Sequence, residues 1–142
     1  MKRLLLSVSL VLIASCSPPV WVDKSAGLSS ESGNWGPVLT VLEHNCVHCH
    51  GDNRLSSMPP INDTHALSKL IGSHWIVPGK PEASRFFQVV TFADEMPGAM
   101  PPSGHAISKR DVQLLRRWIQ DGARLPKNNV KLIPVGPLPR SI

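Results

Sequence analysis

Five consecutive residues constrain this chain more than any other stretch. Two residues separate Cys46 from Cys49, and His50 follows directly, so the segment has the pattern C-x-x-C-H. One helical turn between the two thiols sets each of them at one vinyl group of a porphyrin, and the next side chain then points its imidazole at the iron. The pattern therefore predicts one covalently attached haem c, held by Cys46, Cys49 and His50.

Two other uses of a C-x-x-C pair fit the sequence less well. A structural zinc site needs four ligands, usually with a second pair at similar spacing, and the chain has no second C-x-x-C. His44 and His48 could complete such a site, but His50 would then have no role. A thioredoxin-like redox pair needs a strand before it and a helix after it, whereas here a helix-like segment comes first and a polar loop follows.

The N-terminus has the features of a bacterial export signal. A charged start, Lys2-Arg3, precedes an apolar run over 4–14 that is too short to span a bilayer. Residues 13–16, Ile-Ala-Ser-Cys, resemble the lipobox of bacterial lipoproteins, in which the chain is cut before the cysteine and its sulfur receives a diacylglycerol. The resemblance makes Cys16 the lipidation site. The alternative is an ordinary signal peptide with an incidental cysteine.

The sequence divides into four segments. We expect a lipoprotein signal peptide at 1–15, a lipid-anchored flexible linker rich in Ser, Gly and Pro at 16–35, a haem domain at 36–125 and a Pro-rich, extended C-terminal tail at 126–142. The expected location is the periplasmic side of a bacterial membrane. The outer membrane is favoured because Ser, rather than Asp, follows Cys16.

Apolar residues at helical spacing predict an all-α domain. A helix beginning at Gly36-Pro37 leads into the haem motif, and the strongest helix has Ser108 as N-cap, Asp111 three residues later and Gly122 at its end. Aromatic residues are few and Tyr is absent, so a buried porphyrin would supply much of the core. The predicted helices cover 36 to the haem motif, 64–71, 81 to about 90, and 109–121.

Several segments together resemble the bacterial monohaem cytochrome c family. The resemblance covers roughly residues 36–125 and implies a small helical domain of the cytochrome c type, wrapped around one covalently bound haem c. Its motifs in this chain are the C-x-x-C-H of 46–50, Met58-Pro59-Pro60-Ile61 in place of x-P-P-L, the P-G-x-P-x-x-S turn of 78–84, Met100-Pro101-Pro102, and the W-I-x-x-G-A of 118–123.

The resemblance also implies neighbours for the haem. In that family a proline carbonyl in the loop after the motif accepts the Nδ1 proton of the haem histidine, which holds an axial His in one orientation. We expect the carbonyl of Pro59 or Pro60 to do this for His50, with Pro60 favoured, and Ile61 to pack on the haem. The alternative is a plain turn.

Three methionines compete as the second axial ligand. Met58 lies only eight residues after His50 and would have to pass around the haem edge, whereas Met96 and Met100 both lie in the loop before the last helix. Met100 directly precedes a proline pair, as the ligand does in the resembling domains, and is therefore preferred to Met96. Histidines remain as alternatives, and the most plausible of them is His105; the others are His44, His48, His65 and His74.

These features predict an electron-transfer protein rather than an enzyme. His/Met ligation fills both axial positions of the iron, which favours electron transfer over oxygen chemistry. No nucleophile–base pair or pair of acids stands out, so no small-molecule substrate is evident. The alternatives are a haem c subunit of a larger dehydrogenase or reductase complex, and a small open-iron haem peroxidase or sensor.

The charge is unevenly distributed along the chain. The formal charge is +5, and without Lys2 and Arg3 it is 13 − 10 = +3, which does not indicate a nucleic-acid partner. From residue 108 onward the chain has eight Lys and Arg and two Asp. The rest of the mature chain has five basic and eight acidic residues. The last helix and the tail could therefore steer a redox protein partner that is acidic at the contact surface, or lie near anionic lipid headgroups. The alternative is a solvated helix face. The other expected partner is a membrane reached through the lipid anchor.

Overall fold

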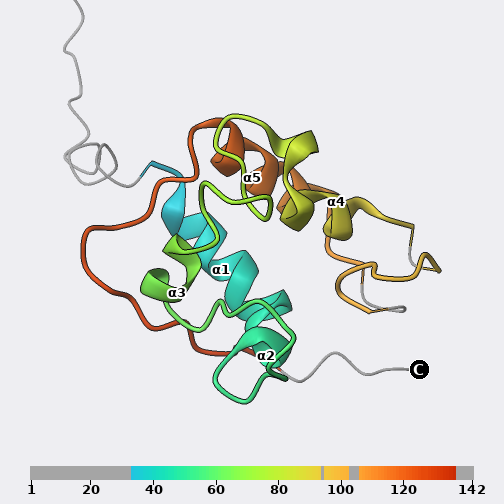
Figure 1. Cartoon of the computed structure of the whole chain (residues 1–142), viewed down its shortest axis with the longest axis horizontal. Helices are drawn as coiled ribbons and strands as arrows, with labels where there is room; N and C mark the ends of the chain where they lie inside the picture. The colour runs from blue at the N-terminus through green and yellow to red at the C-terminus, as the bar shows by residue number, and fades with distance from the viewer. Residues whose placement is uncertain (1–32, 94, 103–105, 137–142) are drawn as a thin grey trace, which may run out of the picture.

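The computed structural model describes residues 33–93, 95–102 and 106–136 of the chain. The predicted signal peptide, the predicted lipidation site Cys16, most of the predicted linker and His105 lie outside these residues. Within them the chain forms helices joined by loops, with two isolated β-bridges and no strand. The prediction of an all-α fold is confirmed for this part of the chain. The elements, shown in Figure 1, are α1 (Trp35–Asn45), α2 (Val47–His50), α3 (Thr64–Ser68), the 3-10 helix η2 (Pro81–Ala83), α4 (Arg85–Thr91) and α5 (Lys109–Gln120).

The core forms where α1 packs against α5. The indoles of Trp35 and Trp118 lie with ring centroids 6.3 Å apart and tilted by 50°, and both are buried. Because Trp35 belongs to this core, α1 begins one residue before the predicted domain boundary at 36. The other fully buried side chains of the two helices are Val38, Leu42, Leu115 and Ile119.

The ends of α5 agree with the sequence prediction. Ser108 is the N-cap, and its hydroxyl accepts the N–H of Asp111 at 3.1 Å. Gly122 follows the helix with φ +98°, a conformation that glycine adopts without steric cost. These two residues fix the length of the helix that covers α1.

The segment predicted as one helix from 81 to about 90 is divided in two. Ser84 has extended backbone angles and is fully buried between η2 and α4. Its hydroxyl accepts the N–H of Val77 at 2.9 Å and donates to the carbonyl of Lys80 at 2.9 Å. These bonds replace helical ones, so the chain turns at Ser84. The short helix predicted for 64–71 ends early as well, since α3 stops at Ser68.

The described part of the C-terminal segment, up to residue 136, is extended, as predicted, but it packs on the domain. Figure 1 shows it leaving the end of α5, passing α3 and reaching α2. Leu132 is 1% exposed and belongs to the core, so a domain boundary at 125 is too early. We call residues 128–135 the strap. Lys131 of the strap forms an ion pair with Asp52, and hydrogen bonds from Lys131 and Asn62 lower the pKa of the Asp52 carboxyl.

No helix among the described residues has both the length and the apolar character needed to cross a bilayer.

Candidate haem-binding site

The haem motif occupies one tight turn at the junction of α1 and α2. The carbonyl of Cys46 accepts the N–H groups of Cys49 at 3.2 Å and of His50 at 3.0 Å. These bonds hold the side chains of Cys46, Cys49 and His50 within a single turn. Both cysteines are free thiols; Cys46 is half-buried against the core and Cys49 is exposed.

The imidazole of His50 is oriented by the loop that follows it. Its Nδ1 lies 3.0 Å from the carbonyl oxygen of Pro59. A carbonyl oxygen can only accept, so in the neutral ring the proton is on Nδ1 and the lone pair of Nε2 is left for a ligand bond. This is the tautomer that binds a metal through Nε2.

Pro59, not Pro60, supplies this carbonyl, so the preference for Pro60 is wrong. The reason is the register of the loop. The N–H of Ile61 donates to the carbonyl of His50 at 3.1 Å. This bond brings the carbonyl of Pro59, two residues before Ile61, within hydrogen-bonding distance of the imidazole Nδ1. Ile61 itself is 3% exposed and belongs to the core beside the motif.

Gly51 is a site residue that the sequence analysis did not single out. A Cβ at this position would lie 2.5 Å from the carbonyl oxygen of Val47 and 3.3 Å from a Val47 methyl. Only glycine therefore allows the backbone that follows α2 to pass so close to Val47, the first residue of that helix. The signal in the sequence is the glycine placed directly after the motif histidine.

The surroundings of the Cys46 sulfur favour an uncharged state. Burial, and after it the neighbouring Cys49, raise the pKa of the Cys46 thiol to about 12. A thioether carries no charge, so its burial has no ionic desolvation cost. Two free thiols in one turn and an imidazole with a free Nε2 fit the two vinyl groups and the iron of one haem.

The histidines of the zinc alternative are held elsewhere. The Nδ1 of His44 lies 2.8 Å from the carbonyl of Thr40, and the Nε2 of His48 lies 3.2 Å from the carbonyl of Val135. Among the described residues no group of three or more His, Cys, Asp or Glu side chains is placed to hold a metal ion. Within the part of the chain that the structure describes, the two cysteines are therefore not joined by further donors of the kind that a zinc site needs.

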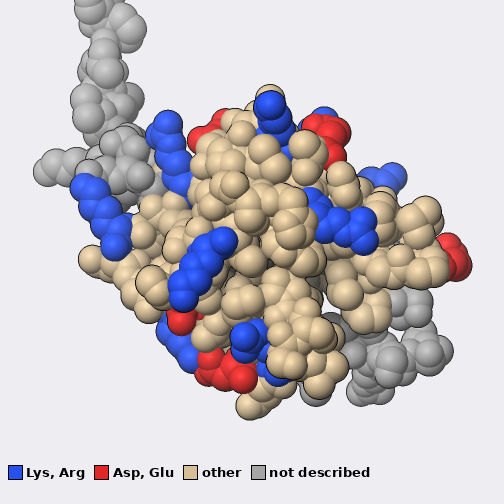
Figure 2. Space-filling model, in the orientation of Figure 1, with Lys and Arg blue, Asp and Glu red and all other residues tan. Residues whose placement is uncertain are grey.

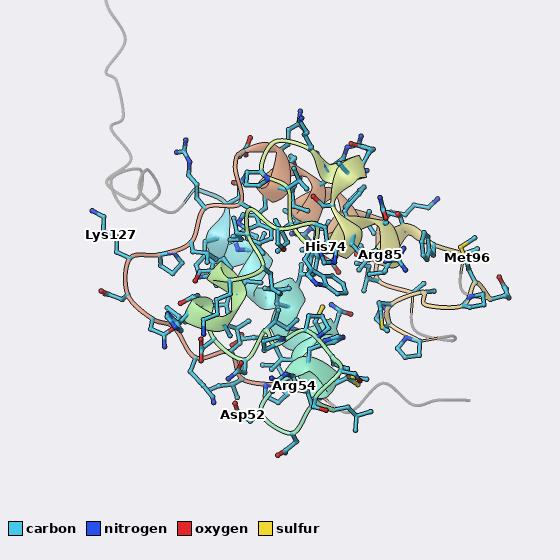
Figure 3. All side chains as sticks on the ribbon, viewed as in Figure 1. Asp52, Arg54, His74, Arg85, Met96 and Lys127 are labelled. Atoms are coloured by element: carbon cyan, nitrogen blue, oxygen red, sulfur yellow. The ribbon has the colours of Figure 1, made fainter. Side chains whose placement is uncertain are left out.

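The three candidate methionines differ in their surroundings. The N–H of Met100 donates to the carbonyl of Val89 at 2.8 Å, and Met100 is half-buried with buried residues on both sides of it, Ala99 and Pro101. Met96 is 48% exposed, and Figure 3 shows it at the outer end of the loop that follows α4. Met58 lies in the loop that carries Pro59. The structure therefore anchors the backbone of Met100 on α4 and leaves Met96 about half exposed.

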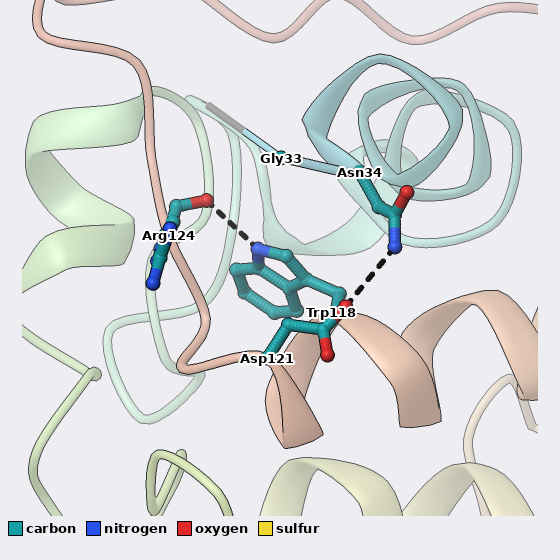
Figure 4. A pocket seen from close by; sticks show the side chains of 5 residues that line it. All are labelled: Gly33, Asn34, Trp118, Asp121 and Arg124. Atoms are coloured by element: carbon teal, nitrogen blue, oxygen red, sulfur yellow. Dashed lines mark hydrogen bonds between the residues drawn. The ribbon is translucent and has the colours of Figure 1, made fainter. Parts of the chain in front are cut away.

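A shallow pocket of about 290 Å³ lies at the opposite end of α1 from the haem motif. Figure 4 shows Asn34 donating to the Asp121 carboxylate at 3.2 Å and the Trp118 indole donating to the carbonyl of Arg124 at 2.9 Å. Gly33 completes its lining. These hydrogen bonds join the start of α1 to the end of α5, so the pocket is a structural junction.

No protein-family model, curated protein or solved structure significantly matches the chain.

Proposed function

We propose that this chain is a monohaem c-type cytochrome that carries single electrons between redox partners. In this proposal Cys46 and Cys49 bind the haem covalently, His50 is one axial ligand and Met100 is the other. When bound, the haem supplies an iron that cycles between the ferrous and ferric states. The protein binds and orients the haem, and it carries electrons rather than transforming a substrate.

The observation that supports this proposal best is the state of His50. Its Nδ1 is engaged by Pro59, its Nε2 is free, and two unpaired thiols occupy the same turn. A His oriented in this way by a backbone carbonyl is what an axial ligand requires. A histidine in a plain surface turn has no need of a proline carbonyl fixed at its ring.

The partner surface proposed for electron exchange is basic. Arg116 pairs with Glu82, and Lys131 pairs with Asp52, so part of the positive charge is balanced within the domain. Figure 2 shows Lys and Arg side chains spread over the face in view, with Asp and Glu in smaller groups. Exposed basic residues of α5 and the segment after it, namely Lys109, Arg110, Arg117 and Arg124, would steer an acidic redox partner.

The chain is proposed to act on the periplasmic side of a bacterial membrane, anchored through lipid on Cys16.

Spectroscopy and a redox titration of the exported, matured protein test this proposal. We expect a low-spin haem with the weak sulfur-to-iron band of Met ligation, and a reversible one-electron transition. A high-spin ferric haem that readily binds carbon monoxide on reduction would overturn Met ligation and the carrier role, since an open iron favours peroxidase or sensor chemistry. Co-purification with a catalytic subunit would instead place the same electron-transfer site in a larger complex.

A further inference from the structure

The strap bonds to the segment that ends the haem-site loop. The N–H of Leu132 donates to the carbonyl of Asn62 at 2.9 Å, and the N–H of Thr64 donates to the carbonyl of Val130 at 3.0 Å. The N–H of Val130 in turn donates to the Thr64 hydroxyl at 2.9 Å. Residues 62–64 are thus fixed by three hydrogen bonds to residues nearly seventy positions later in the chain.

One strap side chain strengthens this connection. The Oδ1 of Asn129 accepts from the Thr64 hydroxyl at 3.0 Å and from the N–H of His65 at 3.0 Å. It therefore satisfies a donor in the first turn of α3, which has no partner within the helix. Its neighbour Asn128 contributes its backbone carbonyl to the Thr64 hydroxyl, at 3.4 Å.

The other end of the strap bonds to the haem motif and the end of α1. The N–H of Val135 donates to the carbonyl of Glu43 at 3.0 Å, and the N–H of Ile133 donates to the Glu43 carboxylate at 3.0 Å. The carbonyl of Val135 lies 3.2 Å from the Nε2 of His48, inside the C-x-x-C-H turn. The strap therefore joins the turn that carries His50 to the far end of the loop that carries Pro59.

Packing alone does not hold the strap in place. Leu132 is its one core residue among those described, while Ile133 is 61% exposed. A cleft of about 260 Å³ separates part of the strap from Val47 and Gly51. The hydrogen bonds at its two ends therefore determine where the strap lies.

We propose that the strap is a positioning element for His50, because it fixes residues 62–64 against the haem turn and thereby sets the hydrogen bond from His50 to Pro59. Pro59 precedes Asn62 by three residues, and two of these four residues are prolines with restricted backbones. In this proposal a displacement of Asn62 reaches the Pro59 carbonyl through Ile61 and Pro60, and the bond from Ile61 N–H to the carbonyl of His50 belongs to the same loop. This inference rests on the proposed function, and it concerns residues beyond 36–125, where the sequence motifs lie.

The electronic consequence has a definite direction. A carbonyl that accepts the Nδ1 proton makes the imidazole a stronger donor through Nε2. A stronger donor stabilises ferric iron and lowers the reduction potential. Loosening the strap weakens the hydrogen bond from His50, so the reduction potential rises and the Nδ1 proton exchanges faster with solvent.

Asn129→Ala tests the inference, with Asn128→Ala as the matched control. All variants are exported and matured, and mass spectrometry first checks that each carries one attached haem. We expect Asn129→Ala to exchange the His50 Nδ1 proton about tenfold faster in NMR and to have a higher reduction potential. Asn129→Asp keeps an oxygen acceptor at the same place and is expected to restore both values. Asn128→Ala is expected to match the wild type in both.

A second variant acts at the other end of the strap. His48→Leu removes the bond to the Val135 carbonyl and is expected to shift both values in the same direction, which keeps the test available if Asn129→Ala does not mature. The strap proposal alone would be overturned if the variants that mature carry one attached haem and have the same Nδ1 proton exchange rate and reduction potential as Asn128→Ala. A wild-type protein without haem would overturn the proposed function instead.

Discussion

The Nδ1 of His50 lies 3.0 Å from the carbonyl oxygen of Pro59, nine residues later in the chain. This hydrogen bond fixes the tautomer of the ring and leaves Nε2 as the free donor. It depends on the bond from Ile61 N–H to the carbonyl of His50, which closes the loop between α2 and α3. The orientation of the candidate axial ligand is therefore a property of the loop, while its position is a property of the turn.

Gly51→Ala is expected to destabilise the haem turn. The new Cβ would meet the carbonyl of Val47 at 2.5 Å, and backbone that must move apart in this way costs about 1–3 kcal/mol. Gly36→Ala is the control, because a Cβ there has nothing within 4 Å and the position is helical. Denaturant unfolding should show a loss for Gly51→Ala and an unchanged or slightly raised stability for Gly36→Ala. Equal stabilities would contradict the close approach at Gly51.

Leu115→Ala is expected to lower the free energy of unfolding by about 2–5 kcal/mol. Leu115 is fully buried on the face of α5 that packs against α1, whereas Leu55 is 67% exposed. Leu55→Ala should therefore change stability by less than about 0.5 kcal/mol. Thermal or denaturant unfolding of the two variants checks this, and a similar loss for both would mean that α5 is not the core helix.

Ser84→Ala is expected to cost about 1–3 kcal/mol, because the part-buried N–H of Val77 loses its acceptor. The exposed Ser56 provides the matched control, and Ser56→Ala should have little effect on stability. Ser84→Thr keeps the hydroxyl but adds a methyl group at a fully buried position. If Ser84→Ala unfolds at the same denaturant concentration as the wild type, the hydroxyl bridge between Val77 and Lys80 does not stabilise the turn.

Met100→Ala is expected to abolish the sulfur-to-iron band, while Met96→Ala leaves it unchanged. The backbone of Met100 is anchored to Val89 and Met100 is half-buried, whereas Met96 is 48% exposed. Electronic absorption of the ferric protein gives the answer directly. If Met96→Ala loses the band instead, Met96 is the axial ligand and Met100 is not. If the wild type lacks the band, neither methionine is the ligand.

The helices were predictable where the apolar periodicity is long enough. In α5 apolar residues recur at helical spacing from Val112 to Ile119, and the structure has the same cap and the same stop. The break at Ser84 was not predictable in this way, because one hydroxyl replaces backbone hydrogen bonds that helical periodicity assumes. A serine inside an apolar segment carries no sign of which partners it will meet.

The strap was hidden from sequence analysis for a different reason. Its bonds to 62–64 and to Glu43 run largely through the backbone, and a backbone group has no signature in composition. Leu132, with 1% exposure, is the one apolar residue of the strap that is fully buried among those described, and a single leucine sets no period. Prolines and basic residues on either side indicate an extended tail, which describes its conformation and not its contacts.

The most direct test of the central claim is the intact mass of the exported protein under denaturing conditions. We predict a mass equal to that of the processed chain plus one haem. Cys46 and Cys49 should then resist alkylation, and in the variant with both replaced by Ser the haem should be released on denaturation. A colourless protein with two alkylatable thiols in the C-x-x-C-H turn would contradict the account.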